Sequence, residues 1–303
     1  MVKIYNRYIV QHLLKKIPAA LLDKRHFFLL GEILREKRMF NISCYREGTI
    51  RRRISARLKE LNIPSMGEYI TLLQSENGEV DRLISELTIH VSSFFRDPDI
   101  YEELEEEILP SIFDRQAKEK DKKIRLLSLG CSSGEEPYSI AIILLEKFSK
   151  YLSEYNIKII SMDVDNRSIQ KAQAGLYLKR DLSSLSESLL KKYFSEEDNE
   201  VYKIGERVKH LVEFKRSNAI SEPLPDGMDI VFCRNFLIYF NRDTQLELIK
   251  SIVRSLKNGG YIVLGKTDGI LSFLVIDGID TIDSHKRIYI WRGGDNGSGK
   301  KKV

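Results

Sequence analysis

The stretch Ile124-Arg-Leu-Leu-Ser-Leu-Gly130, followed directly by Cys131-Ser-Ser-Gly-Glu-Glu-Pro-Tyr-Ser139, decides the fold. The first part is a short apolar run of the kind that forms a buried strand, and residues 137–155 read as a helix. Gly130 and Gly134 allow the chain to turn tightly between the two and to come close to a ligand. The stretch predicts a strand, a glycine turn and a helix, in a sheet that binds ligands at the carboxyl ends of its strands.

The same alternation of strand and helix continues along the chain. It predicts strands at 157–163, 229–233 and 261–265, helices at 168–174 and 244–256, and a closing edge strand at 287–291. Strands that alternate with helices form a parallel sheet with helices on both faces. We therefore expect a Rossmann-like α/β domain over residues 85–292.

A small antiparallel β-subdomain is expected within this domain, at about residues 195–213. The runs 201–205 and 207–214 read as short strands, and the later part of the second run is expected to rejoin the main sheet. The segment 293–303 is rich in Gly, Asp, Asn, Ser and Lys, so it is expected to be a disordered tail.

Residues 1–84 predict an all-helical N-terminal domain, with residues 1–22 as a separate segment. Apolar residues recur at helical spacing around 29–34 and 50–61, and a further helix begins at Pro64-Ser65. A helix is also expected over 99–113, after Asp97-Pro98. Residues 1–84 hold 16 Lys and Arg against 9 Asp and Glu, so an acidic partner is expected for this basic domain.

The composition excludes several classes of protein. The chain has 303 residues, and no run approaches the roughly 20 apolar residues of a membrane helix. Its three cysteines are far apart and match neither a disulfide framework nor a metal site. We therefore expect a cytoplasmic protein with reduced thiols, no metal and no direct membrane insertion.

Four further side chains are candidates for ligand contacts near the ends of strands. Glu135 and Glu136 disfavour a phosphate ligand and favour a cationic one, although solvated acids beside a tight turn are the plainer alternative. Asp163 ends its strand and is expected to accept hydrogen bonds from ribose hydroxyls, with Asp165 capping the next helix. Asn235 follows the strand at 229–233, and one helical turn would bring it beside Tyr239, unless that segment is simply core.

Together these motifs resemble the signature set of the CheR family of chemotaxis receptor methyltransferases. The matching segments occur in the family's order over roughly residues 23–292, and a basic segment, Tyr45-Arg-Glu-Gly-Thr-Ile-Arg-Arg-Arg-Ile54, is similar to the family's helical N-terminal domain. The other matches are Phe94-Phe-Arg-Asp97, Gly134-Glu-Glu-Pro-Tyr-Ser139, Asp163-Val-Asp165 and Cys233-Arg-Asn235 with Ile238-Tyr-Phe240.

The resemblance implies S-adenosylmethionine (SAM) as cofactor, S-adenosylhomocysteine as product, and methyl transfer to glutamate side chains of chemoreceptors. Arg96 and Tyr239 are the candidates that orient the reacting carboxylate. His90 and Ser92 stand where the family usually has asparagine and threonine, and Lys266-Thr267-Asp268 stands where it often has His-Ser-Glu. The residues implied at the cofactor are His90, Ser92, Arg96, Gly130, Glu136, Asp163, Asn218, Ala219, Asn235 and Phe236.

The resemblance also implies that the basic N-terminal helix contacts the methylation helices of a chemoreceptor. Arg53 and Arg57 lie on one flank of its apolar stripe and Arg51 on the other, whereas a solvated basic face is the alternative. The acidic connection 195–200 lacks glycine, so we do not expect the β-subdomain to tether a receptor peptide. The protein is expected to act as a monomer.

Two other functions fit parts of the sequence. A nucleic-acid methyltransferase would suit the basic domain, but residues 234–237 lack the proline motif of amino-directed enzymes, and no proline precedes Cys233. No nucleic acid is therefore expected. A SAM-binding sensor or scaffold without turnover is the second alternative. An NAD oxidoreductase is disfavoured because Asp163 lies well beyond the usual spacing from the glycine turn.

Overall fold

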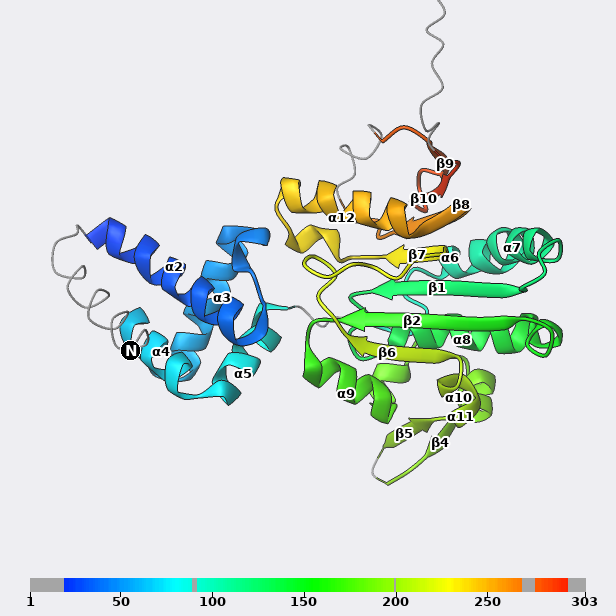
Figure 1. The fold of residues 1–303 in the computed structure, drawn as a ribbon. Helices are drawn as coiled ribbons and strands as arrows, with labels where there is room; N and C mark the ends of the chain where they lie inside the picture. Colours follow the sequence, from blue (N-terminus) through cyan, green and yellow to red (C-terminus); the bar gives the residue numbers. More distant parts are fainter. Residues whose placement is uncertain (1–18, 89–91, 199, 269–275, 294–303) are drawn as a thin grey trace, which may run out of the picture. The chain divides into compact units, whose positions relative to one another are not determined.

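The computed structural model describes residues 19–88, 92–198, 200–268 and 276–293. The chain divides into two compact units, with the boundary between residues 87 and 88 (Figure 1). The predictions for residues 1–18, for His90 and for the tail from residue 294 lie outside the described residues.

The first unit is all-helical. Its elements are α2 (Ala19–Arg38), the 3-10 turn η1 (Ile42–Cys44), α3 (Glu47–Glu60), α4 (Met66–Ser75) and α5 (Asn77–Leu87). Ser65 caps α4 by accepting a hydrogen bond from the Glu68 N–H, as expected from Pro64-Ser65. Helix α2 packs on α4 and α3 packs on α5, and their apolar faces form one core. The fully buried members of this core include Leu30, Leu34, Phe40, Ile50, Tyr69, Leu73, Val80 and Leu83.

The second unit begins with a helical segment that is not regular throughout. Residues 98–116 form α6 (Pro98–Glu103), a π-helical turn η2 (Leu104–Ile108) and α7 (Leu109–Gln116). Pro110 has no N–H to donate to the preceding turn, which accounts for the wider turn before it. The expected single helix at 99–113 is therefore interrupted.

The centre of the second unit is a seven-stranded sheet in the order β6-β2-β1-β7-β8-β10-β9. Neighbours from β6 to β8 are parallel, whereas β10 pairs antiparallel with both β8 and β9. The arrowheads of β1, β2, β6 and β7 point the same way in Figure 1, so their carboxyl ends form one edge. The strands are β1 (Lys123–Leu129), β2 (Asn156–Asp163), β6 (Val212–Arg216), β7 (Met228–Cys233), β8 (Leu256–Leu264), β9 (Ile279–Asp283) and β10 (Ile288–Trp291).

Helices cover this sheet. Helix α8 (Glu135–Lys147) packs on β2 and β6, α9 (Asn166–Ala174) on the same two strands, and α12 (Arg242–Ser255) on β8. Every residue of β7 is buried, as expected for a central strand covered on both faces. The expected α/β architecture is confirmed, but α8 ends at Lys147 rather than near 155. Beyond it the 3-10 turn η3 (Ser149–Tyr151) places Tyr151 against Phe113, with ring centroids 4.2 Å apart.

A three-stranded antiparallel sheet in the order β3-β5-β4 forms the small subdomain. It begins earlier than expected, because β3 (Leu176–Leu178) joins β4 (Phe194–Glu196) and β5 (Val201–Ile204). The expectation of a strand from residue 207 was wrong in its first half: residues 206–209 form the short helix α11. The second half rejoins the main sheet as β6, as expected. The turn η4 (Lys179–Leu182) and helix α10 (Glu187–Tyr193) connect β3 to β4.

Candidate functional site

The glycine turn after β1 is bound to the end of β2. Gly130 and Gly134 have φ angles of +68° and +93°, which favour glycine over residues with a side chain. The N–H groups of Gly130 and Cys131 both donate to the Met162 carbonyl, at 2.8 and 3.1 Å. A Cβ at position 130 would lie 2.6 Å from the Phe236 ring. The turn therefore brings the loops after β1, β2 and β7 together.

The two aspartates after β2 have different roles. Asp165 caps α9 by accepting hydrogen bonds from the backbone N–H groups of Arg167 and Ser168, which confirms the predicted cap. Asp163 accepts from the Ser132 N–H and from the Asp165 N–H, both at 2.9 Å. A carboxylate has two oxygens that can each accept more than one hydrogen bond, which suits a group that binds ribose hydroxyls. That role of Asp163 stays a prediction.

The segment after β6 lies beside the same strand end. The Ser217 N–H donates to the Asp163 carbonyl at 3.0 Å. Asn218 accepts from the Ile220 N–H at 3.1 Å, and Ala219 is buried. The structure thus brings Asn218 and Ala219 next to Asp163, although 55 residues of chain separate them.

A buried arginine that the sequence did not single out holds the other side of the site. Arg234 follows β7, and its side chain is only 3% exposed. Its guanidinium donates to the Asp97 carboxylate at 2.7 Å, to the Arg96 carbonyl at 2.6 Å and to Glu136 at 3.2 Å. Ser128 donates to the other oxygen of Glu136 at 2.7 Å. One guanidinium therefore fixes both Glu136 and the backbone of Arg96.

The segment that carries Arg96 is also tied to α8. The Phe95 N–H donates to the Ser139 hydroxyl at 2.9 Å, and that hydroxyl donates to the Glu135 carbonyl. The Ser92 side chain hydrogen-bonds Glu135. These contacts place Ser92 and Arg96 at the amino end of α8, beside Glu136.

The loop after β7 differs from the expected helical turn. Asn235 has a φ of +52°, in the left-handed region, and only residues 237–239 form a 3-10 turn, η5. The prediction that one α-helical turn joins Asn235 to Tyr239 was therefore wrong. The Asn235 side chain donates to the Thr267 hydroxyl at 2.9 Å, and its N–H donates to buried Asp268 at 2.7 Å.

The polar groups at this edge suit a cationic, hydroxyl-bearing ligand. Glu135, Glu136 and Asp163 surround the glycine turn, and the buried Ser132 hydroxyl finds no hydrogen-bond partner among the described residues. Burial raises the pKa values of Cys131 and Cys233 well above the ordinary range. Both thiols therefore stay protonated, which disfavours a cysteine nucleophile.

Comparison with known families decides the assignment. The profile described as "CheR methyltransferase, SAM binding domain" matches residues 90–275, and the one described as "CheR methyltransferase, all-alpha domain" matches residues 25–88. The chain belongs to the CheR methyltransferase family. SAM is accordingly the cofactor of this chain, and the carboxylates, the orphan hydroxyl and the glycine turn at this edge of the sheet fit it.

Similar proteins include several chemotaxis methyltransferases. The chain is 34% identical to chemotaxis protein methyltransferase 2 of Vibrio cholerae over 224 residues, 72% of this chain and 76% of that protein. It is 30% identical to the chemotaxis protein methyltransferase of Borreliella burgdorferi over 234 residues, 76% of this chain and 83% of that protein. Another relative, an uncharacterized 104.1 kDa protein of Rhodobacter capsulatus, is 30% identical over 85% of this chain. The match spans only 27% of that longer protein.

The three arginines of the basic helix α3 that were predicted to bind substrate differ in their exposure and in their partners. Arg57 is buried and forms an ion pair with Glu79 at 2.8 Å, so its guanidinium is not available to a substrate, and that prediction is withdrawn. Arg51 pairs with Glu47 at 2.7 Å and lies over the Phe27 ring. Arg53 donates to the Glu86 carbonyl. Arg51 and Arg53 remain partly exposed.

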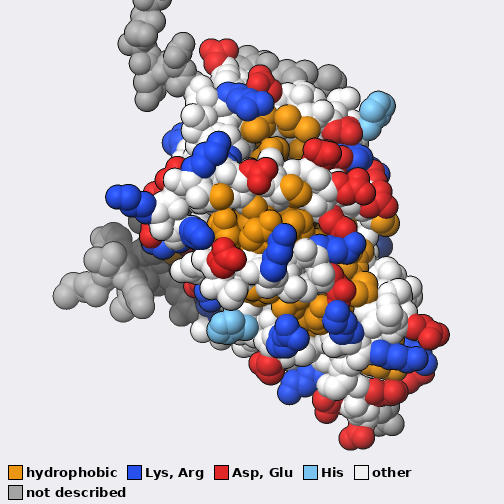
Figure 2. All heavy atoms as spheres, turned by 90° about the vertical axis from the view of Figure 1, so that its right-hand side faces the viewer, with side chains coloured by type: hydrophobic (Ala, Val, Ile, Leu, Met, Phe, Trp, Pro, Cys, Tyr) orange, Lys and Arg blue, Asp and Glu red, His pale blue; other side chains and the backbone are white. Residues whose placement is uncertain are grey.

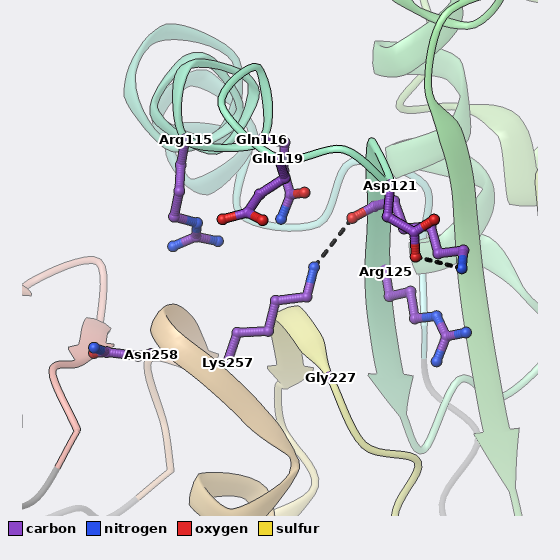
Figure 3. Close-up of a pocket in the computed structure, with 9 residues that line it drawn as sticks. Arg115, Gln116, Glu119, Asp121, Arg125, Gly227, Lys257 and Asn258 are labelled. Carbon is purple, nitrogen blue, oxygen red and sulfur yellow. Dashed lines mark hydrogen bonds and ion pairs between the residues drawn. The ribbon is translucent and has the colours of Figure 1, made fainter.

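A hollow lies at the opposite edge of the CheR sheet, where the strands begin. This cavity of about 530 Å³ is lined by the end of α7 and the starts of β1 and β8. Lys257 reaches the Lys123 carbonyl, and Lys123 pairs with Asp121 (Figure 3). Buried Asp229 accepts from Arg115 and Lys257, both at 2.8 Å. Figure 2 shows acidic and basic side chains intermixed over this face. We therefore assign these charges a structural role.

Among the described residues, the structure shows no three-residue His, Cys, Asp or Glu group suited to a metal ion. None of the described helices combines the length and apolar composition needed to cross a bilayer.

Proposed function

We propose that this chain transfers the methyl group of SAM to glutamate side chains of chemoreceptors, giving methyl esters. The observation that carries the proposal is the single edge of the sheet where the glycine turn, Asp163, Asn218 and Asn235 meet, within a chain of the CheR family. Relatives that share most of the chain are named chemotaxis protein methyltransferases.

The chemistry requires alignment rather than proton transfer. SAM supplies an electrophilic methyl group on a positively charged sulfonium. A glutamate carboxylate, with a pKa of about 4.3 in solution, is already ionised at neutral pH, so no general base is needed. Once held by the site, SAM would give its methyl group to the carboxylate oxygen, with the electron pair of the broken carbon–sulfur bond left on sulfur. Orientation of the two reactants can supply about 7–11 kcal/mol of the barrier.

The residues divide into three groups in this proposal. Asp163, Asn218, Asn235 and the turn at Gly130 hold SAM. Ser92, Ala219 and Phe236 would shape its surroundings, and Glu136 would supply negative charge that favours a cationic cofactor. Arg96 and Tyr239 orient the glutamate carboxylate. Because Glu136 accepts from Arg234 and Ser128 in the structure, its influence on SAM is electrostatic in this scheme.

Substrate recognition is assigned to the N-terminal domain, residues 1–84, and catalysis to residues 85–292. Arg51 and Arg53 are proposed to contact the acidic methylation helices of the receptor, and Arg57 is left out because it is buried. We further propose that the protein acts as a cytoplasmic monomer.

The test of this function is methyl transfer from radiolabelled SAM to chemoreceptor-containing membranes, followed by mild base. Label on the receptor that base releases as methanol would identify carboxyl methyl esters. Base-stable label, or label on RNA, would contradict the proposal that glutamate is the substrate, but it would still show methyltransferase activity. SAM binding without any transfer to an authentic receptor would favour the sensor alternative.

Replacing Arg96 with glutamine or Tyr239 with phenylalanine should lower turnover by about tenfold while changing SAM affinity by less than about threefold. Each change removes one polar contact, worth about 1–2 kcal/mol, from the carboxylate rather than from the cofactor. Steady-state kinetics on receptor membranes and calorimetric SAM binding measure the two effects. A loss confined to SAM affinity would move that residue to the cofactor.

A further inference from the structure

Asp268 connects the ends of two strands through a single carboxylate. Its side chain is fully buried, just beyond β8. One oxygen accepts from the Asn235 N–H at 2.7 Å and the Gly265 N–H at 2.8 Å, and the other accepts from the Ile238 N–H at 3.2 Å. Three converging donors on one buried carboxylate form a rigid arrangement, because ionised acceptors make the stronger hydrogen bonds.

The loop that Asp268 holds is the one proposed to contact SAM. Asn235 has a left-handed backbone, and in this conformation its N–H donates to the Asp268 carboxylate. A Cβ at Gly265 would collide with the Asn235 N and lie 2.6 Å from Asp268, so the two loops are in direct contact. Phe236 then packs over Gly130. A shift of the Asp268 carboxylate would therefore move Asn235 and Phe236 relative to the glycine turn.

We propose that Asp268 is a positioning residue for the cofactor: its carboxylate holds Asn235 and Phe236 in the SAM-binding conformation. The inference rests on the proposed function only in assigning these two residues to SAM. The conformation of the loop that carries Asn235 then depends on a residue outside that loop, because Asp268 lies 33 residues beyond Asn235.

The same carboxylate makes the loop sensitive to pH. Burial raises the pKa of Asp268 to about 6, against the opposing effect of its three N–H donors and of the Arg234 charge. Around it, the Cys233 thiol stays protonated because burial raises its pKa, and Lys266 pairs with Asp99 at 2.8 Å. Protonation of Asp268 would turn one acceptor into a donor facing N–H groups, so SAM affinity should fall as the pH drops through about 6.

The decisive variant is Asp268→Asn, which keeps the shape of the side chain but replaces one acceptor by a donor. The dissociation constant for SAM and for S-adenosylhomocysteine should rise about tenfold, because the amide faces N–H groups. Turnover at saturating SAM should stay within about threefold of wild type. Lys266→Gln is the matched control, because it breaks only the exposed pair with Asp99, and it should leave affinity unchanged.

Calorimetric titration with S-adenosylhomocysteine between pH 5.5 and 8 gives the second readout. Wild-type affinity should fall towards low pH, and this fall should be weaker in Asp268→Asn. Asp268→Glu keeps the carboxylate and should recover part of the affinity. Circular dichroism checks folding, and the wild-type titration decides the matter if the asparagine variant does not fold.

Unchanged affinity in a folded Asp268→Asn, or a flat wild-type profile, would overturn the inference. If a smaller fraction of the Asp268→Asn protein binds S-adenosylhomocysteine, but with the wild-type dissociation constant, the role of Asp268 is purely structural and the inference is also overturned. Weakened binding in Asp268→Asn together with no glutamate methylation by wild type would support the inference while rejecting the proposed function.

Discussion

Replacing Arg57 with alanine should destabilise the helical unit by about 3–5 kcal/mol, because it leaves a buried carboxylate without its partner. Arg57 donates to both oxygens of Glu79, at 2.9 and 2.8 Å, and Tyr69 donates to the same carboxylate at 2.9 Å. The Arg57 and Glu79 side chains are 8% and 2% exposed. Hydrogen exchange of the α3 and α5 amides measures this loss locally.

Two controls separate this effect from a general loss of charge. Arg51→Ala breaks an exposed pair with Glu47 and should cost less than about 1 kcal/mol. The single tryptophan, Trp291, lies in β10, so its fluorescence reports on the second unit and should not change. If Arg57→Ala lowers the free energy of unfolding as little as Arg51→Ala does, the argument from the buried ion pair is refuted.

The pH dependence of the helical unit has a definite sign. Burial alone would raise the pKa of Glu79, but hydrogen bonds from Arg57 and Tyr69 outweigh it and hold the pKa below the ordinary 4.5. The unfolded chain therefore takes up the proton first, and the stabilisation is present above about pH 4.5 and lost as the pH falls below it. In Arg57→Ala, burial should raise the pKa of Glu79 above its ordinary value, because the arginine no longer opposes it. Protonation of Glu79 should then make the variant more stable in acid than at neutral pH.

The sequence predicted the architecture well because the apolar periodicity and the turn and cap residues on which the prediction rests are both local features of the chain. Apolar runs of strand length alternate with helical stretches, and the glycine turn and the Asp165 cap depend on residues close in the chain. The errors also have local causes. Pro110 interrupts a helix, and the run from residue 207 forms one helical turn before β6 begins. Periodicity alone does not distinguish short segments of this kind.

The candidate site was only partly predictable. Sequence motifs pointed to Asp163 and Asn235, because each follows a recognisable strand. They could not assign partners to Arg234 or Asp268, which act through contacts up to 138 residues away in the chain. The pattern also placed Arg57 beside Arg53 as a surface cation, since a helical wheel does not show a buried glutamate 22 residues further on.

Replacing Arg234 with glutamine should lower kcat/KM for methyl transfer by about 100-fold or more. The guanidinium joins Asp97, Glu136 and the Arg96 backbone, and no neutral side chain can donate to all three. Burial would lower the pKa of Arg234, but Tyr101, Glu136 and Asp97 raise it above the ordinary value, so it stays charged. Loss of this charge would displace Arg96 and also leave the Glu136 and Asp97 carboxylates without their donor, so several parts of the site would shift together. The expected loss is therefore larger than for Arg96→Gln, since a misplacement of about 1 Å can cost about 100-fold.

Lysine at position 234 separates charge from geometry. An ammonium retains the charge but lacks the planar fork that reaches several acceptors, so Arg234→Lys should also lose most activity. Arg242→Gln, on the exposed start of α12, is the matched control and should behave as wild type. Near-normal kinetics of Arg234→Lys would show that charge alone suffices and that Arg96 is held by other contacts.

A double-mutant cycle then identifies which partner matters. If Arg234 acts mainly by compensating Glu136, Glu136→Gln should restore part of the stability lost in Arg234→Gln, because no uncompensated carboxylate remains. Activity should not return with it, since the Arg96 carbonyl would still lack its donor. Because Glu136 is itself proposed to act on SAM, the turnover of the double mutant is compared with that of Glu136→Gln alone. Recovery of stability with a turnover well below that of Glu136→Gln would assign Arg234 to the placement of Arg96, and through it to the orientation of the glutamate substrate.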